Sequence, residues 1–178
     1  MKYGDVFLNK ALIVYYSEHH SSEKNKISNE EKVVNELKRL FEEKKISLQI
    51  LLLEPLEKLH LKDQFRKEKE IKIKTKIPDL SNYSSIIIGS PVVGAMTSSP
   101  VINSFIRQID FSKSKNKPIL GIYSTGIISG FELKKMTSLL SMKGVKPVLS
   151  ESFNSMFDFD SKKLAEIKEF FDKFIEFI

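Results

Sequence analysis

Apolar positions along this chain follow two alternating patterns, and together they predict an order of strands and helices. Continuous apolar runs between polar residues are typical of strands that are buried on both faces of a parallel sheet. Such runs, or shorter apolar segments, predict strands at 11–16, 47–53, 86–88, 118–124 and 146–153. Helical spacing of apolar residues predicts helices over 28–45, from 100 onward, over 130–143 and across 164–175. This alternation predicts an α/β fold, a parallel sheet with helices on both faces.

Local signals mark where two of these helices begin. Ser28 followed by Glu31 matches a capping box, in which each side chain accepts a backbone N–H of the other residue. Ser99 is a favourable N-cap, and Pro100 suits the first helical position. In the closing helix one face is predicted to point inward, formed by Leu164, Ile167, Phe170, Phe171, Phe174 and Ile175.

The segment 54–83 is the weakest part of the pattern, and we expect an irregular surface excursion. Residues 55–65 allow a short helix with Leu56, Leu59 and Phe65 inward. Polar and apolar residues alternate over 70–77, which favours an extended segment on the surface. No internal repeat appears, so residues 1–178 are interpreted as one domain with an N-terminal extension at 1–10.

Composition narrows the class of protein. No apolar run approaches the roughly 20 residues that span a bilayer, and the N-terminus lacks a signal-peptide pattern, so we expect a cytoplasmic chain without membrane attachment. The absence of cysteine excludes disulfides and thiolate metal sites. The net charge is +6, but the lysines are dispersed and not interleaved with aromatics, which indicates a solvated surface and no nucleic-acid partner.

A run of small residues follows the third predicted strand. Ile86-Ile87-Ile88 is expected to break at Gly89-Ser90-Pro91 into a loop that closes at Ser99. A loop of Gly, Ser, Ala and Thr at the carboxyl end of a buried strand lets main-chain groups approach a flat ligand closely.

Four segments in this order resemble the flavodoxin family, over nearly the whole chain from Ala11. They are the first strand at 12–17, the loop from Ser90, the start of a loop at 124–126 and the lead into the last strand at 142–148. The resemblance implies a three-layer fold with a five-stranded parallel sheet of order 2-1-3-4-5. It also implies non-covalently bound FMN where the loops after strands one, three and four converge.

The resemblance carries over to particular residues. It implies an FMN-phosphate loop and two loops beside the flavin ring, formed by Ser17, His19, His20, Ser21 and Ser22, then Ser90, Pro91, Val92, Val93, Gly94 and Ala95, and then Ser124, Thr125 and Gly126. His19 and His20 match a His-His subset of the family, although as a pair on a polar loop they are also typical of solvated side chains. No metal site and no catalytic side chain are predicted.

The chain departs from the family pattern in two places. The Gly-Asn-Thr of the phosphate loop is missing, and the helix cap at Ser28 comes several residues late. The ring aromatic is replaced by Val93, and the chain has no Trp. Phe131, Tyr16 and Tyr123 are the candidates to replace that aromatic, and the two tyrosines are expected in the core because they lie inside strand runs.

The function that the resemblance implies is electron transfer between redox partner proteins by a monomer or homodimer. Two alternatives stay open: an FMN-dependent NAD(P)H or quinone reductase, and an interaction domain without flavin. Neither a nucleophile elbow, nor a dinucleotide fingerprint, nor a phosphate loop of the nucleotide-triphosphate type is present.

Overall fold

The sheet has the predicted order of parallel strands. The computed structural model describes residues 10–17, 27–59, 71–93, 97–112, 114, 117–126, 131–154 and 160–178. The strands lie in the order β2-β1-β3-β5-β6, which are Ser47–Leu52, Lys10–Tyr15, Ser85–Val93, Ile119–Gly126 and Leu149–Asn154. All four pairings along this path are parallel. Because the short β4 (Thr97–Ser98) lies off the path, this order is the predicted 2-1-3-4-5, and the prediction is confirmed.

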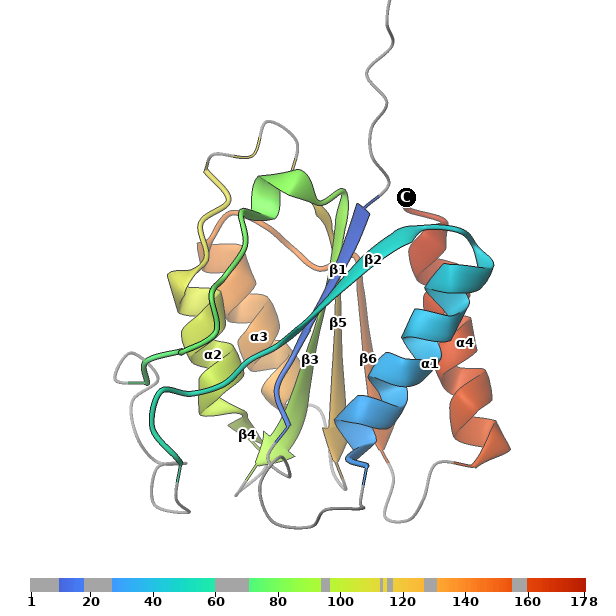
Figure 1. The fold of residues 1–178 in the computed structure, drawn as a ribbon, viewed down its shortest axis with the longest axis horizontal. Coiled ribbons are helices and arrows are strands. Elements are labelled where there is room, and N and C mark those ends of the chain that lie inside the picture. The colour runs from blue at the N-terminus through green and yellow to red at the C-terminus, as the bar shows by residue number, and fades with distance from the viewer. Residues whose placement is uncertain are drawn as a thin grey trace, which may run out of the picture.

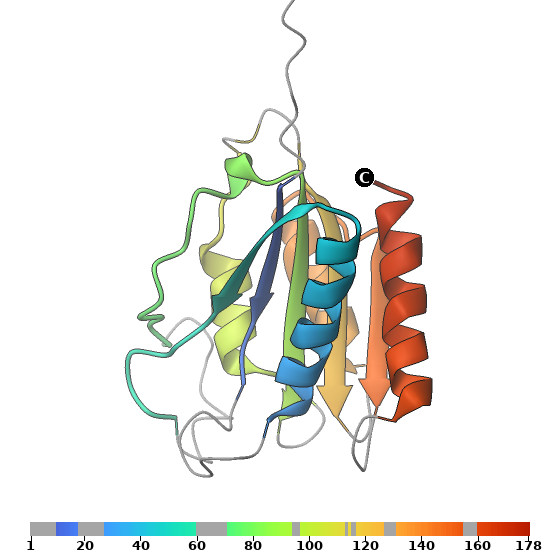
Figure 2. The same ribbon diagram turned by 45° about the vertical axis from the view of Figure 1, so that its right-hand side comes forward.

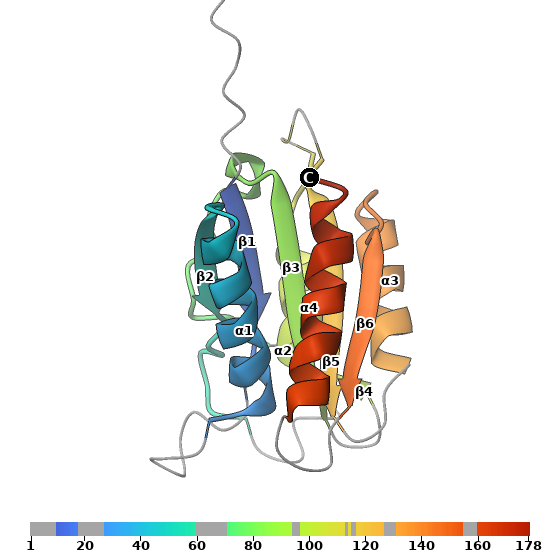
Figure 3. The same cartoon turned by 90° about the vertical axis from the view of Figure 1, so that its right-hand side faces the viewer.

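Helices cover both faces of the sheet, which confirms the three-layer arrangement (Figure 1). On one face lie α1 (Asn29–Glu43) and α4 (Ser161–Ile175), and on the other lie α2 (Pro100–Gln108) and α3 (Phe131–Met142). Figure 3 shows α1 and α4 side by side in front of the sheet. No described helix combines the length and apolar character needed to cross a membrane.

The two predicted helix starts are confirmed. The Ser28 N–H donates to Glu31 Oε2 at 3.0 Å, and the Glu31 N–H donates to Ser28 Oγ at 3.1 Å, so the capping box of α1 is complete. Ser99 is the N-cap of α2, with Pro100 in its first turn and the Val101 N–H donating to Ser99 Oγ at 3.2 Å. These bonds satisfy donors that a helix start leaves unpaired.

Each face of the sheet has its own apolar core. Under α1 and α4 the core is rich in phenylalanine, and the Phe41 and Phe171 rings meet edge to face at 4.9 Å between centroids. The predicted inward face of α4 is correct from Ile167 onward but wrong at Leu164, which is 41% exposed. Leu164 lies in the first turn of the helix, one turn before the first buried residue, Ile167.

The described parts of the 54–83 excursion contain no α-helix. Pro55 forms an antiparallel bridge with Ile73, flanked by two backbone hydrogen bonds of 2.8 Å. Leu56 is 56% exposed, so its predicted inward position is wrong, and Ile71, an apolar residue of the alternating segment, is buried. The Ser104 hydroxyl of α2 donates to the Ile71 carbonyl at 2.8 Å, which ties the excursion to the helix layer. Phe65 lies outside the described residues.

The predicted break at Gly89 is wrong, because β3 continues to Val93. The ladder with β5 runs on through Ser90 and Pro91, and Val92 then pairs with Ser98 of β4. The last pair with β1 is Gly89 with Tyr15, so Pro91 lies where β3 no longer pairs with β1, and proline is tolerated there.

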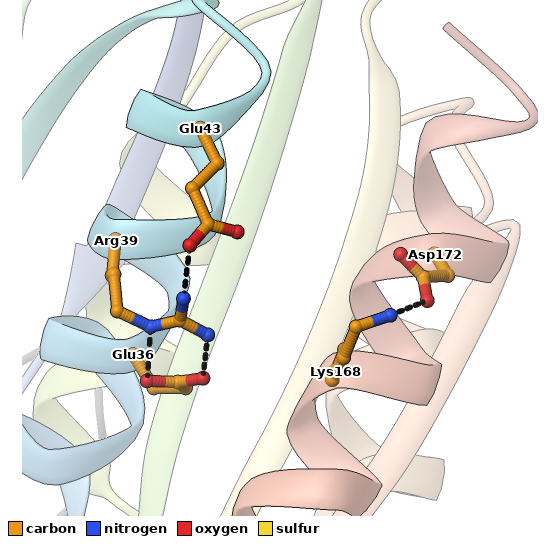
Figure 4. Close-up of polar contacts among 5 residues, drawn as sticks. All are labelled: Glu36, Arg39, Glu43, Lys168 and Asp172. Carbon is orange, nitrogen blue, oxygen red and sulfur yellow. Dashed lines mark hydrogen bonds and ion pairs between the residues drawn. The ribbon is translucent and has the colours of Figure 1, made fainter.

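Many charged side chains of the described helices pair along the solvent side. On α1, Arg39 contacts Glu36 and Glu43, and on α4 Lys168 contacts Asp172 (Figure 4). Exposed pairs of this kind contribute little to stability, because water and salt screen them. They fit the interpretation of the charge as a solvated surface.

Gly89→Ala should destabilise the fold strongly, because a Cβ at this position would lie 2.1–2.6 Å from the ring of Tyr123. Overpacking in a core costs about 1–3 kcal/mol, and we expect the free energy of unfolding to fall by at least that amount. The measurement is urea unfolding followed by circular dichroism. Gly121→Ala is the control for a milder clash, since its Cβ would lie 3.0 Å from the Phe174 ring and should cost less than the Gly89 substitution. An equal loss in both variants would contradict the role of the Tyr123 contact.

Candidate functional site

The carboxyl ends of β1, β3 and β5 meet at one edge of the sheet. The register pairs Tyr15 with Gly89, and Gly89 with Tyr123. Figure 2 shows the arrowheads of these strands directed to the same end of the molecule. Ser17 follows the end of β1 and is buried. The structure therefore brings the described residues of the three predicted loops to one edge, where open α/β sheets bind ligands.

Val92 and Gly126 are two predicted ring-flanking residues that contact each other here. Both are partly exposed. A Cβ at Gly126 would lie 2.7 Å from the Val92 Cβ, so the end of β5 passes directly against the Val92 side chain. The described ends of β3 and β5 thus lie in direct contact, and both of these residues are partly accessible.

The Ser90 hydroxyl is fully buried and holds the β3–β4 hairpin together. It donates to the Pro91 carbonyl at 3.0 Å and accepts the Ser99 N–H at 3.1 Å. Beside it, the Ser98 hydroxyl donates to Asn103 Oδ1 at 2.9 Å. These serines connect the hairpin to the first turn of α2.

The hydroxyls of Ser124 and Thr125 also have protein partners, and these are buried carboxylates. On the α3 side, Ser124 Oγ donates to Glu132 Oε1 at 2.7 Å, and Glu132 is fully buried. On the α1 side, Thr125 Oγ1 donates to Glu30 Oε1, and Glu30 is 6% exposed. Each glutamate lies in the first turn of its helix, where the helix dipole favours a negative charge.

Two tyrosines at the same edge lie within the field of the α1 carboxylates. The pKa of Tyr123 is raised well above its ordinary value by burial, and then by the charge of Glu30. The pKa of Tyr15 is raised by burial, then by Glu31 and Glu30. The Tyr123 hydroxyl is buried with no hydrogen-bond partner. Both phenols therefore stay neutral at physiological pH.

The first turn of α1 does not fit a phosphate dianion. A helix start binds anions through unpaired N–H groups and its positive dipole end. Here the capping box uses the Glu31 N–H, and the turn carries the Glu30 and Glu31 carboxylates. Phosphate contacts by Ser17 stay a prediction, and no phosphate contact is assigned to this helix.

One of the three candidate ring aromatics is accessible. Tyr16 and Tyr123 are core residues as predicted, with 8% and 0% exposure. Phe131 opens α3 shortly after β5 and is 71% exposed, with Lys134 Nζ 5.8 Å from its ring centroid.

Several predicted site residues lie outside the described residues. They are His19, His20, Ser21, Ser22, Gly94 and Ala95, together with the side chain of Val93. Within the described part of the chain, no cluster of three or more metal-ligating side chains occurs. Sequence reasoning missed Glu30 and Glu132, because a glutamate in a first helical turn gives no signal of turning inward.

No protein-family model and no curated protein sequence matches this chain. Solved structures do match its fold. A putative flavoprotein from Bacteroides uniformis is 17% identical, with a TM-score of 0.62 over 90% of this chain and 98% of the other. The two-electron reduced flavodoxin of Megasphaera elsdenii is 15% identical, with a TM-score of 0.58 over 92% and 98% of the two chains.

A larger protein contains a similar domain. Rubredoxin oxygen:oxidoreductase from Desulfovibrio gigas is 14% identical with a TM-score of 0.59, and the match covers 94% of this chain but 35% of that one. This chain thus spans about a third of that protein's length. At such identities the likeness shows the fold alone: the chain has a flavodoxin-like fold.

Proposed function

We propose that this chain is a flavin-binding electron-transfer protein that holds the flavin ring where β1, β3 and β5 end. The observation that carries the proposal is the partly exposed surface of Val92 and Gly126 at this edge, in a flavodoxin-like fold. The proposed flavin is FMN, as the sequence resemblance implies. Redox partner proteins and a cytoplasmic location belong to the same proposal.

The residues of the chain supply binding and cover. Val92 and the backbone at Gly126 would hold the flavin ring, and the exposed Phe131 at the start of α3 would supply an aromatic cover for it. When bound, a flavin supplies the redox chemistry by taking up and releasing one or two electrons. The chain itself excludes water from the ring and presents apolar side chains and backbone groups to it.

An interaction domain without flavin is the second candidate, and one observation favours it. The hydroxyls of Ser90, Ser124 and Thr125, all predicted to contact the cofactor, are buried and bonded to protein atoms. A flavin would therefore depend on the backbone and apolar groups of this edge. No described feature favours the reductase alternative.

Flavin binding can be measured by adding the protein to FMN and to riboflavin and following flavin fluorescence. We expect quenching that saturates, together with a rise in the midpoint of thermal unfolding, because bound ligand stabilises the folded state. FAD should bind more weakly, since no residues at this edge are predicted to contact its adenylate part. No quenching and no stabilisation by either flavin would contradict the proposal and favour the interaction domain.

Phe131→Ala should weaken flavin binding about 2- to 10-fold, corresponding to the roughly 0.5–1.5 kcal/mol of an aromatic pair. Because Phe131 is exposed, the substitution should leave thermal stability without flavin nearly unchanged. Dissociation constants from the same titration check this. Phe177→Ala is the control, since this exposed aromatic lies near the C-terminus beyond α4. Equal affinities for Phe131→Ala and the parent protein would remove Phe131 from the ring site.

A further inference from the structure

Glu30 is a charged group turned into the protein at the edge proposed to hold the flavin. Its carboxylate accepts a hydrogen bond from the hydroxyl of Thr125, a residue 95 positions away in the sequence, and both side chains are buried. This bond joins the first turn of α1 to the carboxyl end of β5. The carboxylate therefore lies at the junction of two elements that border the edge.

The same carboxylate changes the electrostatics of the α1 start. A helix start attracts anions because its dipole leaves a partial positive charge there. In α1 that charge is offset from within the chain, since Glu30 and Glu31 both lie in the first turn. Glu31 also closes the capping box with the Ser28 N–H, so the two glutamates have different partners.

The charge of Glu30 also acts on two tyrosines of the sheet, which flank Gly89 at the ends of β1 and β5. The pKa of Tyr123 is raised by burial and then by Glu30, and the pKa of Tyr15 is raised by burial, then by Glu31 and Glu30. Tyr123 is fully buried, and its hydroxyl has no partner. Because Glu30 is buried, water screens its charge weakly, and its carboxylate would oppose an anion brought to the start of α1.

We infer that Glu30 is a specificity-determining residue, which disfavours a phosphate dianion at the start of α1 and leaves flavin recognition to the ring. This inference rests on the proposed flavin site and states which flavins it prefers. FMN binds, but its phosphate contributes little, so FMN and riboflavin have similar affinities. Like charges that approach each other in a poorly screened region repel, and this repulsion is specific to the phosphate.

The experiment compares Glu30→Gln with the parent protein in titrations with FMN and riboflavin. Glutamine keeps the volume and can still accept the Thr125 hydroxyl, but it removes the charge. Glu42→Gln is the matched control, because it makes the same charge change at the other, exposed end of the same helix. Thermal unfolding of each variant without ligand checks that it folds.

We expect the parent protein and Glu42→Gln to bind the two flavins within about 3-fold of each other. In Glu30→Gln the affinity for FMN should rise about 10-fold, or about 1.4 kcal/mol, with riboflavin unchanged. An unchanged ratio in Glu30→Gln, or a strong FMN preference in the parent protein, would overturn the inference while leaving the flavin site intact.

Inorganic phosphate provides a readout that does not depend on flavin. We expect phosphate to raise the unfolding midpoint of Glu30→Gln more than that of the parent protein or of Glu42→Gln at matched ionic strength. If no flavin binds any variant, the proposed function fails, and this phosphate arm still decides the role of Glu30. Equal midpoint shifts in all three proteins would overturn it.

Discussion

The close pairing of β3 with β5 is the constraint on which the rest of the structure depends. Tyr123 of β5 lies over Gly89 of β3 so closely that no side chain fits at that glycine. This contact allows the two strands to run together to Pro91 and Thr125, past the end of β1. The candidate site follows from it, because the extra length of β3 and β5 places Val92 against Gly126.

Much of the fold was predictable because its elements carry strong local signals. The apolar runs of β1, β3 and β5 indicated buried parallel strands, and Ser28 and Ser99 marked two helix starts correctly. The pattern at Gly89-Ser90-Pro91 misled, since glycine and proline usually end a strand. Here the glycine is needed because the ring of Tyr123 packs against it. Tyr123 lies more than thirty residues away, so the local sequence does not indicate this contact.

The candidate site was less predictable than the fold. Its position at the strand ends follows from the order of strands, but the partners of its hydroxyls do not. Ser124 and Thr125 alternate to opposite faces of β5, and each meets a glutamate from a different helix layer. Only the folded chain shows that these carboxylates turn inward. The 54–83 excursion was uncertain for a similar reason: its bridge and its bond to α2 are contacts between segments far apart in the sequence.

A flavodoxin-like fold thus carries a site whose polar groups are largely bonded within the protein, and whose first helix start is negatively charged. In this account, backbone and apolar surface hold the ring, with Glu30 opposing phosphate. The most direct test of that central claim is a two-dimensional amide NMR titration of the isotope-labelled protein with riboflavin. The account predicts the largest shifts at the amides of Ser17, Val92, Gly126 and Phe131. Shifts confined to β2 and the 54–83 excursion, or no shifts at saturating riboflavin, would contradict it.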